Sequence, residues 1–492
     1  MFNIYESTRN SDKKVSSKQA ILEGISDDGG LYVWPDIDTL SFDLETICNQ
    51  TYMENAIMIL SKLLPDYTKE ELEDCIHNAY GTGLFTVPQV TPLKKVGDVY
   101  VCELFHGPTS AFKDVALTLL PQLMQKALQT TNQKALILTA TSGDTGKAAL
   151  SGFQDVKDTG IIVFYPDQKV SQIQYRQMVT QRGNNVQVYG VKGNFDDAQS
   201  QVKQLFLNPE LQQIAKENNI LLTSANSINI GRLVPQIVYY FESYKQLVKQ
   251  GVIQIGDKVS FSVPTGNFGD ILAGYYGYMM GLPVEKFYVA SNANNVLTEF
   301  FKTGVYDRNR DFIQTISPSM DILISSNLER LLYYMSGKDT QFVKKCMDDL
   351  AQKGKYAIGQ DMLERLQSLF GCGYVDDQQT KEVIANTYKE TNVVLDPHTA
   401  IGYEIAKEAN NRPMVSLATA SPYKFSVDVL DALNKEAKDE WDAMKQLGTI
   451  CQDKIPTGLA ELESLPVRHD SVITIEQMKE QVTKTMKEWF HD

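Results

Sequence analysis

One lysine stands in the segment of this sequence that is best placed to do chemistry. Lys113 lies in a turn of small residues, 107–114, after an apolar strand-like run (99–105) and before a helix-like run (115–128). An amine held on such a turn can form a Schiff base with a carbonyl cofactor, and pyridoxal phosphate is the usual one. A lone lysine near a helix start is more often a solvated surface residue, so the interpretation depends on other segments.

The turn formed by residues 263–270 has the composition of a phosphate site. It follows an apolar run and carries Gly266 and Gly269 before a helix-like run. Glycines let the backbone approach an anion, and amides at a helix N-terminus can then hold a phosphate. A Gly-x-x-Gly turn after a strand is weak evidence by itself. Asp270 fits poorly, because a carboxylate repels a phosphate, and helix capping is the alternative role.

Two further loops are rich in groups that bind anions. Residues 139–146 offer hydroxyls and glycines, but Ala148 stands where a Walker A motif has serine or threonine. Residues 226–232 end in Arg232, whose planar fork suits phosphate or carboxylate, although a surface position is equally open. The turn at 263–270 and the loop at 139–146 are two separate anion-binding loops, which indicate a phosphorylated cofactor together with an anionic or phosphorylated substrate.

Two other loops supply single groups of interest. Thr419 ends an apolar run, and its hydroxyl could bond to the nitrogen of a pyridine ring. His398 lies in a polar loop, 396–399, but nothing in the sequence pairs it with a nucleophile. We therefore interpret His398 as structural.

These loops require a scaffold in which strands and helices alternate. From residue 99 onward, short apolar runs rich in β-branched residues alternate with helical periods, which predicts mostly parallel sheet covered by helices. Ligands bind at the carboxyl ends of such strands, where all these loops would meet. The expected strands are residues 99–105, 135–141, 160–165, 186–191, 220–224, 259–263, 286–290 and 414–419.

The patterning divides the chain into four parts. We expect a helical N-terminal region (1–95), an α/β core that binds the cofactor (96–305), a helical insertion or lid (306–392), and a return to the core sheet followed by C-terminal helices (393–492).

Composition excludes several classes of protein. The 492 residues carry a formal net charge of −14, which argues against a nucleic-acid binder. The six cysteines form no Cys-x-x-Cys, as expected of reduced thiols in the cytosol. Residues 1–14 are polar, unlike a secretory signal, and no apolar run approaches membrane-spanning length. We expect a cytoplasmic protein that binds a small molecule and neither metal, nucleic acid nor membrane, as a monomer or homodimer.

Together the motifs resemble the threonine synthase family, pyridoxal-phosphate enzymes of the tryptophan-synthase β-like class (fold type II). The resemblance covers nearly the whole chain, and its motifs follow in the family's order at residues 5–9, 27–32, 106–114, 141–146, 226–229, 264–270 and 396–400. It implies an α/β fold with two parallel-sheet, Rossmann-like three-layer domains, a helical N-terminal region and a helical insertion.

The resemblance also implies roles for individual residues. Lys113 would hold pyridoxal phosphate as the internal aldimine and shuttle protons. The other expected cofactor-binding residues are Gly266, Asn267, Phe268, Gly269 and Asp270 at the phosphate and Thr419 at the pyridine nitrogen. The expected substrate-binding residues are Ser142, Asp144, Thr145, Asn226, Ser227, Asn229 and Arg232.

Two positions depart from the family pattern. Lys147 stands where a small residue is more usual and could add a cation near the substrate phosphate. Ser421 and Pro422 replace a more usual His-Pro and could alter local packing.

The implied activity is conversion of O-phospho-L-homoserine and water to L-threonine and phosphate, the last step of threonine biosynthesis. Two alternatives stay open. One is another enzyme on this fold, a phospholyase or a serine or threonine dehydratase. The other is a catalytically silent homologue that acts as a regulator, against which the intact Lys113 and both anion-binding loops count.

Overall fold

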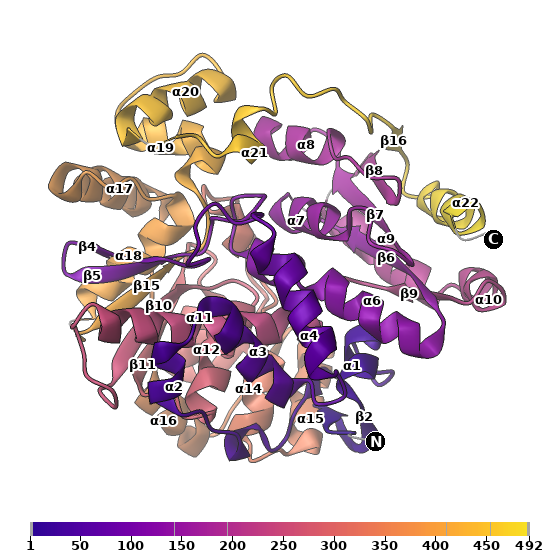
Figure 1. The fold of residues 1–492 in the computed structure, drawn as a ribbon, viewed down its shortest axis with the longest axis horizontal. Coiled ribbons are helices and arrows are strands. Elements are labelled where there is room, and N and C mark those ends of the chain that lie inside the picture. The colour runs from indigo at the N-terminus through magenta and orange to yellow at the C-terminus, as the bar shows by residue number, and fades with distance from the viewer. Residues whose placement is uncertain (1–2, 142, 194, 410, 453, 490–492) are drawn as a thin grey trace.

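Two parallel sheets form the body of the protein (Figure 1). The computed structural model describes residues 3–489 apart from residues 142, 194, 410 and 453. The larger sheet has the order β14 (Phe370–Tyr374), β11 (Val284–Ser291), β10 (Val259–Pro264), β15 (Met414–Ala418), β5 (Val99–Glu103) and β4 (Leu93–Val96). The smaller sheet has the order β16 (Val472–Ile473), β8 (Val186–Val191), β7 (Thr159–Pro166), β6 (Lys134–Ala140) and β9 (Ile220–Thr223).

The pairing within the sheets follows from the buried, apolar character of the strands. All neighbours are parallel except β4, which pairs antiparallel with β5. Every residue of β5, β7, β10 and β15 is buried, as expected for strands covered by helices on both faces. The eight strands expected from the sequence are therefore confirmed, with ends that differ by at most two residues.

Helices cover both sheets (Figure 1). They are α1 (Ser17–Glu23), α2 (Leu44–Asn49), α3 (Tyr52–Leu63), α4 (Lys69–Ile76), α5 (Lys113–Leu117), α6 (Leu120–Thr131), α7 (Asp144–Phe153), α8 (Gln172–Val179), α9 (Phe195–Leu207), α10 (Pro209–Glu217), α11 (Ile230–Lys249), α12 (Gly269–Met279), α13 (Val296–Thr303), α14 (Leu328–Met335), α15 (Thr340–Lys353), α16 (Gln360–Leu369), α17 (Asp377–Thr391), α18 (Pro397–Glu408), α19 (Ser426–Ala432), α20 (Glu440–Cys451), α21 (Thr457–Ala460) and α22 (Met478–Trp489). Within the described residues, none of them is both long and apolar enough to cross a membrane.

Helix breaks occur where capping residues interrupt a helical period. Apolar residues keep a helical spacing over residues 42–63, but Thr51 and Glu54 form a capping box that starts α3 separately from α2. The helical pattern over residues 195–217 likewise divides at Asn208, which caps α10 before Pro209.

Short strands complete the terminal regions and the predicted insertion. The N-terminal region contains a small antiparallel sheet, β2 (Asn10–Val15), β1 (Tyr5–Ser7) and β3 (Tyr32–Val33), beside its helices. Residues 306–392 are not only helical, because β14 adds an edge strand to the larger sheet and β13 (Lys355–Ala357) pairs with β12 (Val305–Asp307). Near the C-terminus, β16 joins the smaller sheet beside β8. Movement of residues 306–392 as a lid stays a prediction.

Candidate active site

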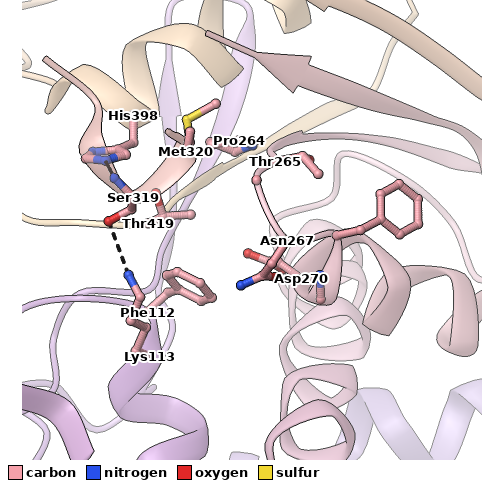
Figure 2. Close-up of a pocket in the computed structure, with 13 residues that line it drawn as sticks. Phe112, Lys113, Pro264, Thr265, Asn267, Asp270, Ser319, Met320, His398 and Thr419 are labelled. Atoms are coloured by element: carbon pink, nitrogen blue, oxygen red, sulfur yellow. Dashed lines mark hydrogen bonds between the residues drawn. The ribbon is translucent and has the colours of Figure 1, made fainter. Parts of the chain in front are cut away.

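One cavity brings together distant segments of the chain (Figure 2). All seven residues expected to bind the cofactor line it. The lining consists of Phe112, Lys113, residues 264–270, Ser319, Met320, His398 and Thr419. Lys113 begins α5 after β5, the glycine turn follows β10, and Thr419 follows β15. The carboxyl ends of three neighbouring strands therefore meet at the cavity, as the parallel topology predicts.

The amine of Lys113 is held inside this cavity. The residue is 7% exposed, and its Nζ donates a hydrogen bond to Ser319 Oγ at 3.3 Å. Figure 2 shows the amine directed at Ser319, across the cavity from Asn267 and Asp270. Burial lowers the pKa of Lys113, although Asp144, with Oδ2 3.6 Å from Nζ, opposes the shift. The unprotonated amine, which is the nucleophilic form, is therefore favoured relative to a solvated lysine.

Backbone pairing fixes Lys113 against the segment that carries Thr419. Phe112 N donates to Thr419 O at 2.8 Å, and Ser421 N donates to Ser110 O at 3.1 Å. Ala111 and Ala420 form an isolated antiparallel bridge between these bonds. The loops after β5 and β15 thus form one rigid wall of the cavity.

The glycine turn forms the opposite wall. Phe268 has a φ of 66° and caps α12, with its ring buried against Phe301 and Phe370. A Cβ on Gly266 would lie 3.1 Å from Ser319 O and 3.2 Å from Met320 Cα. Asn267 Oδ1 accepts from Gly269 N at 2.9 Å, which stabilises the turn. The close approach of residues 319 and 320 therefore favours glycine at position 266.

A buried charge cluster lies beside Lys113. Asp144 Oδ1 is 2.7 Å from Lys424 Nζ and accepts from Gln174 Nε2 at 3.2 Å. Lys424 also donates to Thr109 O at 3.1 Å. Burial alone would raise the pKa of Asp144, but Lys424 and Lys113 outweigh it and hold that pKa well below its usual range. Asp144 is therefore a permanent anion between two amines.

Arg232 is a buried cation near this cluster. It is 3% exposed, its Nη1 donates to Ala225 O at 3.1 Å, and its Nε has no hydrogen-bond partner among the described residues. Burial lowers the pKa of Arg232 to about 10, and its charge in turn lowers the pKa of Lys113. A buried guanidinium with a free N–H is suited to receive an anion.

The other expected substrate-binding residues differ in their placement. The side chain of Asn229 is used within the fold. Its Oδ1 accepts from Gly231 N at 2.8 Å, which caps α11, and its Nδ2 donates to Ile21 O at 2.9 Å. Asn229 therefore serves as the N-cap of α11, and its expected contact with the substrate stays a prediction. Ser227 and Asn226 lie half-buried in the loop before α11, and Thr145 lies in the first turn of α7. Ser142 lies outside the described residues.

The two departures from the family pattern have local explanations. Lys147 donates to Gln181 Oε1 at 2.5 Å and does not line the cavity, and its role as an extra cation near the substrate phosphate stays a prediction. Ser421 caps the short 3-10 helix η4 (Pro422–Phe425), accepting from Tyr423 N at 3.4 Å. That helix carries Lys424 to Asp144.

Sequence reasoning missed several residues of the site. Ser319 and Met320 belong to a one-turn 3-10 helix, η3 (Pro318–Met320), and no motif in the sequence marks them. Lys424 follows Thr419 by five residues, so a cation in that loop was a detectable signal. His398, which we interpreted as structural, does line the cavity. Its Nε2 accepts from Ser319 N at 3.2 Å, and its other ring nitrogen, Nδ1, lies 2.7 Å from Asp396 Oδ2, so it positions Ser319.

Comparisons with known proteins agree with this geometry. Residues 77–417 match the family of pyridoxal-phosphate dependent enzymes, residues 4–80 match the threonine synthase N terminus, and residues 399–483 match the threonine synthase C-terminal family. The protein is thus a pyridoxal-phosphate enzyme of fold type II, with two parallel-sheet domains as expected.

Similar proteins narrow the class. The chain is 38% identical to threonine synthase of Pseudomonas aeruginosa over 432 residues, covering 86% of this chain and 88% of the relative. The pyridoxal-phosphate-bound threonine synthase of Brucella melitensis superposes with a TM-score of 0.88 at 35% identity, covering 98% of this chain and 99% of that one. The chain belongs to the threonine synthase family.

A human relative shares nearly all of this chain. Threonine synthase-like 1 of Homo sapiens is 36% identical over 488 residues, which is 96% of this chain. The chain spans 64% of the length of that relative.

The residues present fit pyridoxal phosphate. An amine and a glycine turn face one another across one cavity, and a hydroxyl lies on its wall. The turn begins a helix, whose N-terminal amides and dipole favour a phosphate. Lys113, residues 266–270 and Thr419 are the groups that would hold the aldehyde, the phosphate and the ring.

Proposed function

We propose that this chain converts O-phospho-L-homoserine and water to L-threonine and inorganic phosphate, acting as a carbon–oxygen lyase. The observation that supports this most directly is the buried amine of Lys113, which faces the glycine turn and has a cluster of charged groups beside it. Relatives named threonine synthase that match over most of their length add support. The cytoplasmic location and the monomeric or homodimeric state stay predictions.

Each wall of the cavity has a distinct task in this reaction. When bound, pyridoxal phosphate supplies the electron sink that lets a proton leave the carbon beside the substrate's amino group. The glycine turn would hold the phosphate of the cofactor, and Thr419 would offer the ring nitrogen a neutral hydroxyl. A hydroxyl does not fix a permanent positive charge on that nitrogen as a carboxylate would.

Lys113 moves the protons. Its lowered pKa makes the amine a better base near neutral pH, so it can accept a proton from the substrate and return one later. Ser319 Oγ accepts a hydrogen bond from this amine and limits the directions in which it can point. Asp144 remains ionised beside it and stabilises the protonated form.

Arg232 and the loop before α11 serve the leaving group. After a proton has also left Cβ, the electron pair that it leaves there allows the bond between Cγ and the phosphate oxygen to break, and the departing phosphate carries the electron pair of that bond away. Water then adds its oxygen at Cβ, and protons are returned to Cγ and to the carbon beside the amino group to complete threonine. A buried guanidinium stabilises charge on the phosphate more than a solvated one does, because little water screens it.

Product analysis tests the proposal. Purified protein supplied with pyridoxal phosphate and O-phospho-L-homoserine should release threonine and phosphate in equal amounts. A keto acid and ammonia in place of threonine would identify a phospholyase, and absence of turnover would support the silent homologue.

A spectrum separates loss of activity from loss of the cofactor site. The wild-type protein should absorb at about 410–420 nm when loaded, as lysine-linked pyridoxal phosphate typically does, and Lys113→Ala should not. A Lys113→Ala protein that retains the band would contradict the role given to Lys113.

A further inference from the structure

The carboxyl group of Asp270 presents an electrostatic conflict in the phosphate cradle. Asp270 lines the cavity in the first turn of α12, immediately after Gly269, and is 6% exposed. A carboxylate here faces the position that a phosphate dianion would take, and like charges in a poorly solvated site repel strongly.

The contacts of Asp270 leave one oxygen without a partner. Its Oδ1 accepts hydrogen bonds from the hydroxyls of Tyr239 (2.6 Å) and Tyr240 (3.0 Å), both on α11. Its Oδ2 is buried and has no partner among the described residues. No lysine, arginine or histidine of the described chain forms an ion pair with it within 4.0 Å. An isolated ionised carboxylate in such a place is costly, whereas a protonated one carries a donor on its free oxygen.

The titratable groups around Asp270 come from three elements. Tyr239 and Tyr240 face it from α11, Cys102 faces it from β5, and Lys113 acts on it from α5. Burial raises the pKa of Asp270 to about 6, while the two tyrosine hydrogen bonds and Lys113 partly oppose that rise. A phosphate dianion would raise it further, because it adds negative charge on the side that Lys113 now faces.

We propose that Asp270 takes up a proton from solvent when the phosphorylated cofactor enters the cradle, and that its free oxygen then donates a hydrogen bond in place of repelling the phosphate. The proton comes from the buffer and is released again when the cofactor leaves. The inference depends only on the cofactor and holds whatever reaction the enzyme performs.

Calorimetry of cofactor binding tests this. Full-length protein freed of cofactor is titrated with pyridoxal 5′-phosphate at pH 7.5 in buffers of different ionisation enthalpy, which gives the number of protons taken up. The wild type should take up close to one proton more per site than Asp270→Asn, whose amide is a permanent neutral donor. The Kd of the wild type for pyridoxal 5′-phosphate, divided by that of Asp270→Asn, should rise about tenfold per pH unit above pH 6.

Two controls isolate the effect. Asp428→Asn removes a carboxyl whose pKa burial also raises to about 6 but which does not line the cavity, and it should keep the wild-type proton uptake. Pyridoxal, which lacks the phosphate, should give the same proton count for wild type and Asp270→Asn.

Equal proton uptake by wild type and Asp270→Asn with pyridoxal 5′-phosphate would overturn the proposal. If Asp270→Asn does not fold, infrared difference spectra of wild-type protein with isotope-labelled aspartate decide the matter. A protonated carboxyl band should appear on binding the phosphorylated cofactor, and its absence would also overturn the proposal.

Discussion

Lys424 and Asp144 form a fully buried ion pair that joins the loops following two different sheets. Lys424 Nζ lies 2.7 Å from Asp144 Oδ1, and neither side chain is more than 3% exposed. Lys424 follows β15 of the larger sheet, whereas Asp144 follows β6 of the smaller one. The pair therefore holds the two sheets together at the cavity while it fixes the charge next to Lys113.

Lys424→Met should destabilise the protein. It leaves Asp144 buried with Lys113 as its remaining ion-pair partner, and breaking such a pair costs about 3–5 kcal/mol. Urea unfolding should show this loss, and Asp144→Asn combined with Lys424→Met should recover part of it. Strictly additive losses in the double variant would show that the two charges do not depend on each other.

Ser319→Ala should slow turnover without reducing cofactor content. The substitution removes the 3.3 Å hydrogen bond from Lys113 Nζ, and a bond of this kind contributes about 0.5–1.5 kcal/mol, or roughly 2- to 12-fold in kcat. Steady-state kinetics at equal absorbance of bound cofactor measure the effect. Ser336→Ala, at the end of α14 and outside the cavity lining, is the matched control. An unchanged kcat for Ser319→Ala would mean that Lys113 needs no such orientation.

Arg232→Gln should weaken substrate binding and leave the cofactor in place. Removing a charge-assisted hydrogen bond costs about 1.5–3 kcal/mol, which corresponds to roughly 10- to 150-fold in KM. Inhibition by inorganic phosphate should weaken in parallel, because the same guanidinium would hold the product. Unaltered inhibition by inorganic phosphate in this variant would show that Arg232 does not bind the departing phosphate.

Lys147 should make the free energy of unfolding vary with pH in the alkaline range. Burial lowers the pKa of Lys147 from 10.5 to about 8 in the folded protein. Between these values the unfolded chain binds more protons than the folded one, so the contribution of Lys147 to stability rises with pH. The urea unfolding midpoint of the wild type minus that of Lys147→Met should therefore increase as the pH rises from 7.5 to 10. A flat difference would show that the amine is as well solvated in the fold as in the unfolded chain.

The sequence was most informative where chemistry and local structure coincide. Lys113, the glycine turn and Thr419 each lie at the end of an apolar strand, and that position could be read from neighbouring residues alone. The short strands β1, β14 and β16 escaped prediction, because two to five residues carry little periodicity. In addition, β14 and β16 pair with strands far along the chain, β11 and β8.

The order of motifs was enough to predict the parallel architecture, the lysine and the phosphate turn, since a strand followed by a particular turn is a local property of the chain. Only the tertiary structure decided that Ser319 meets Lys113 and that Lys424 neutralises Asp144. Those contacts join residues up to 280 positions apart, as between Asp144 and Lys424, and they depend on how the two sheets pack. Side-chain distances across such an interface follow from packing that no single segment encodes.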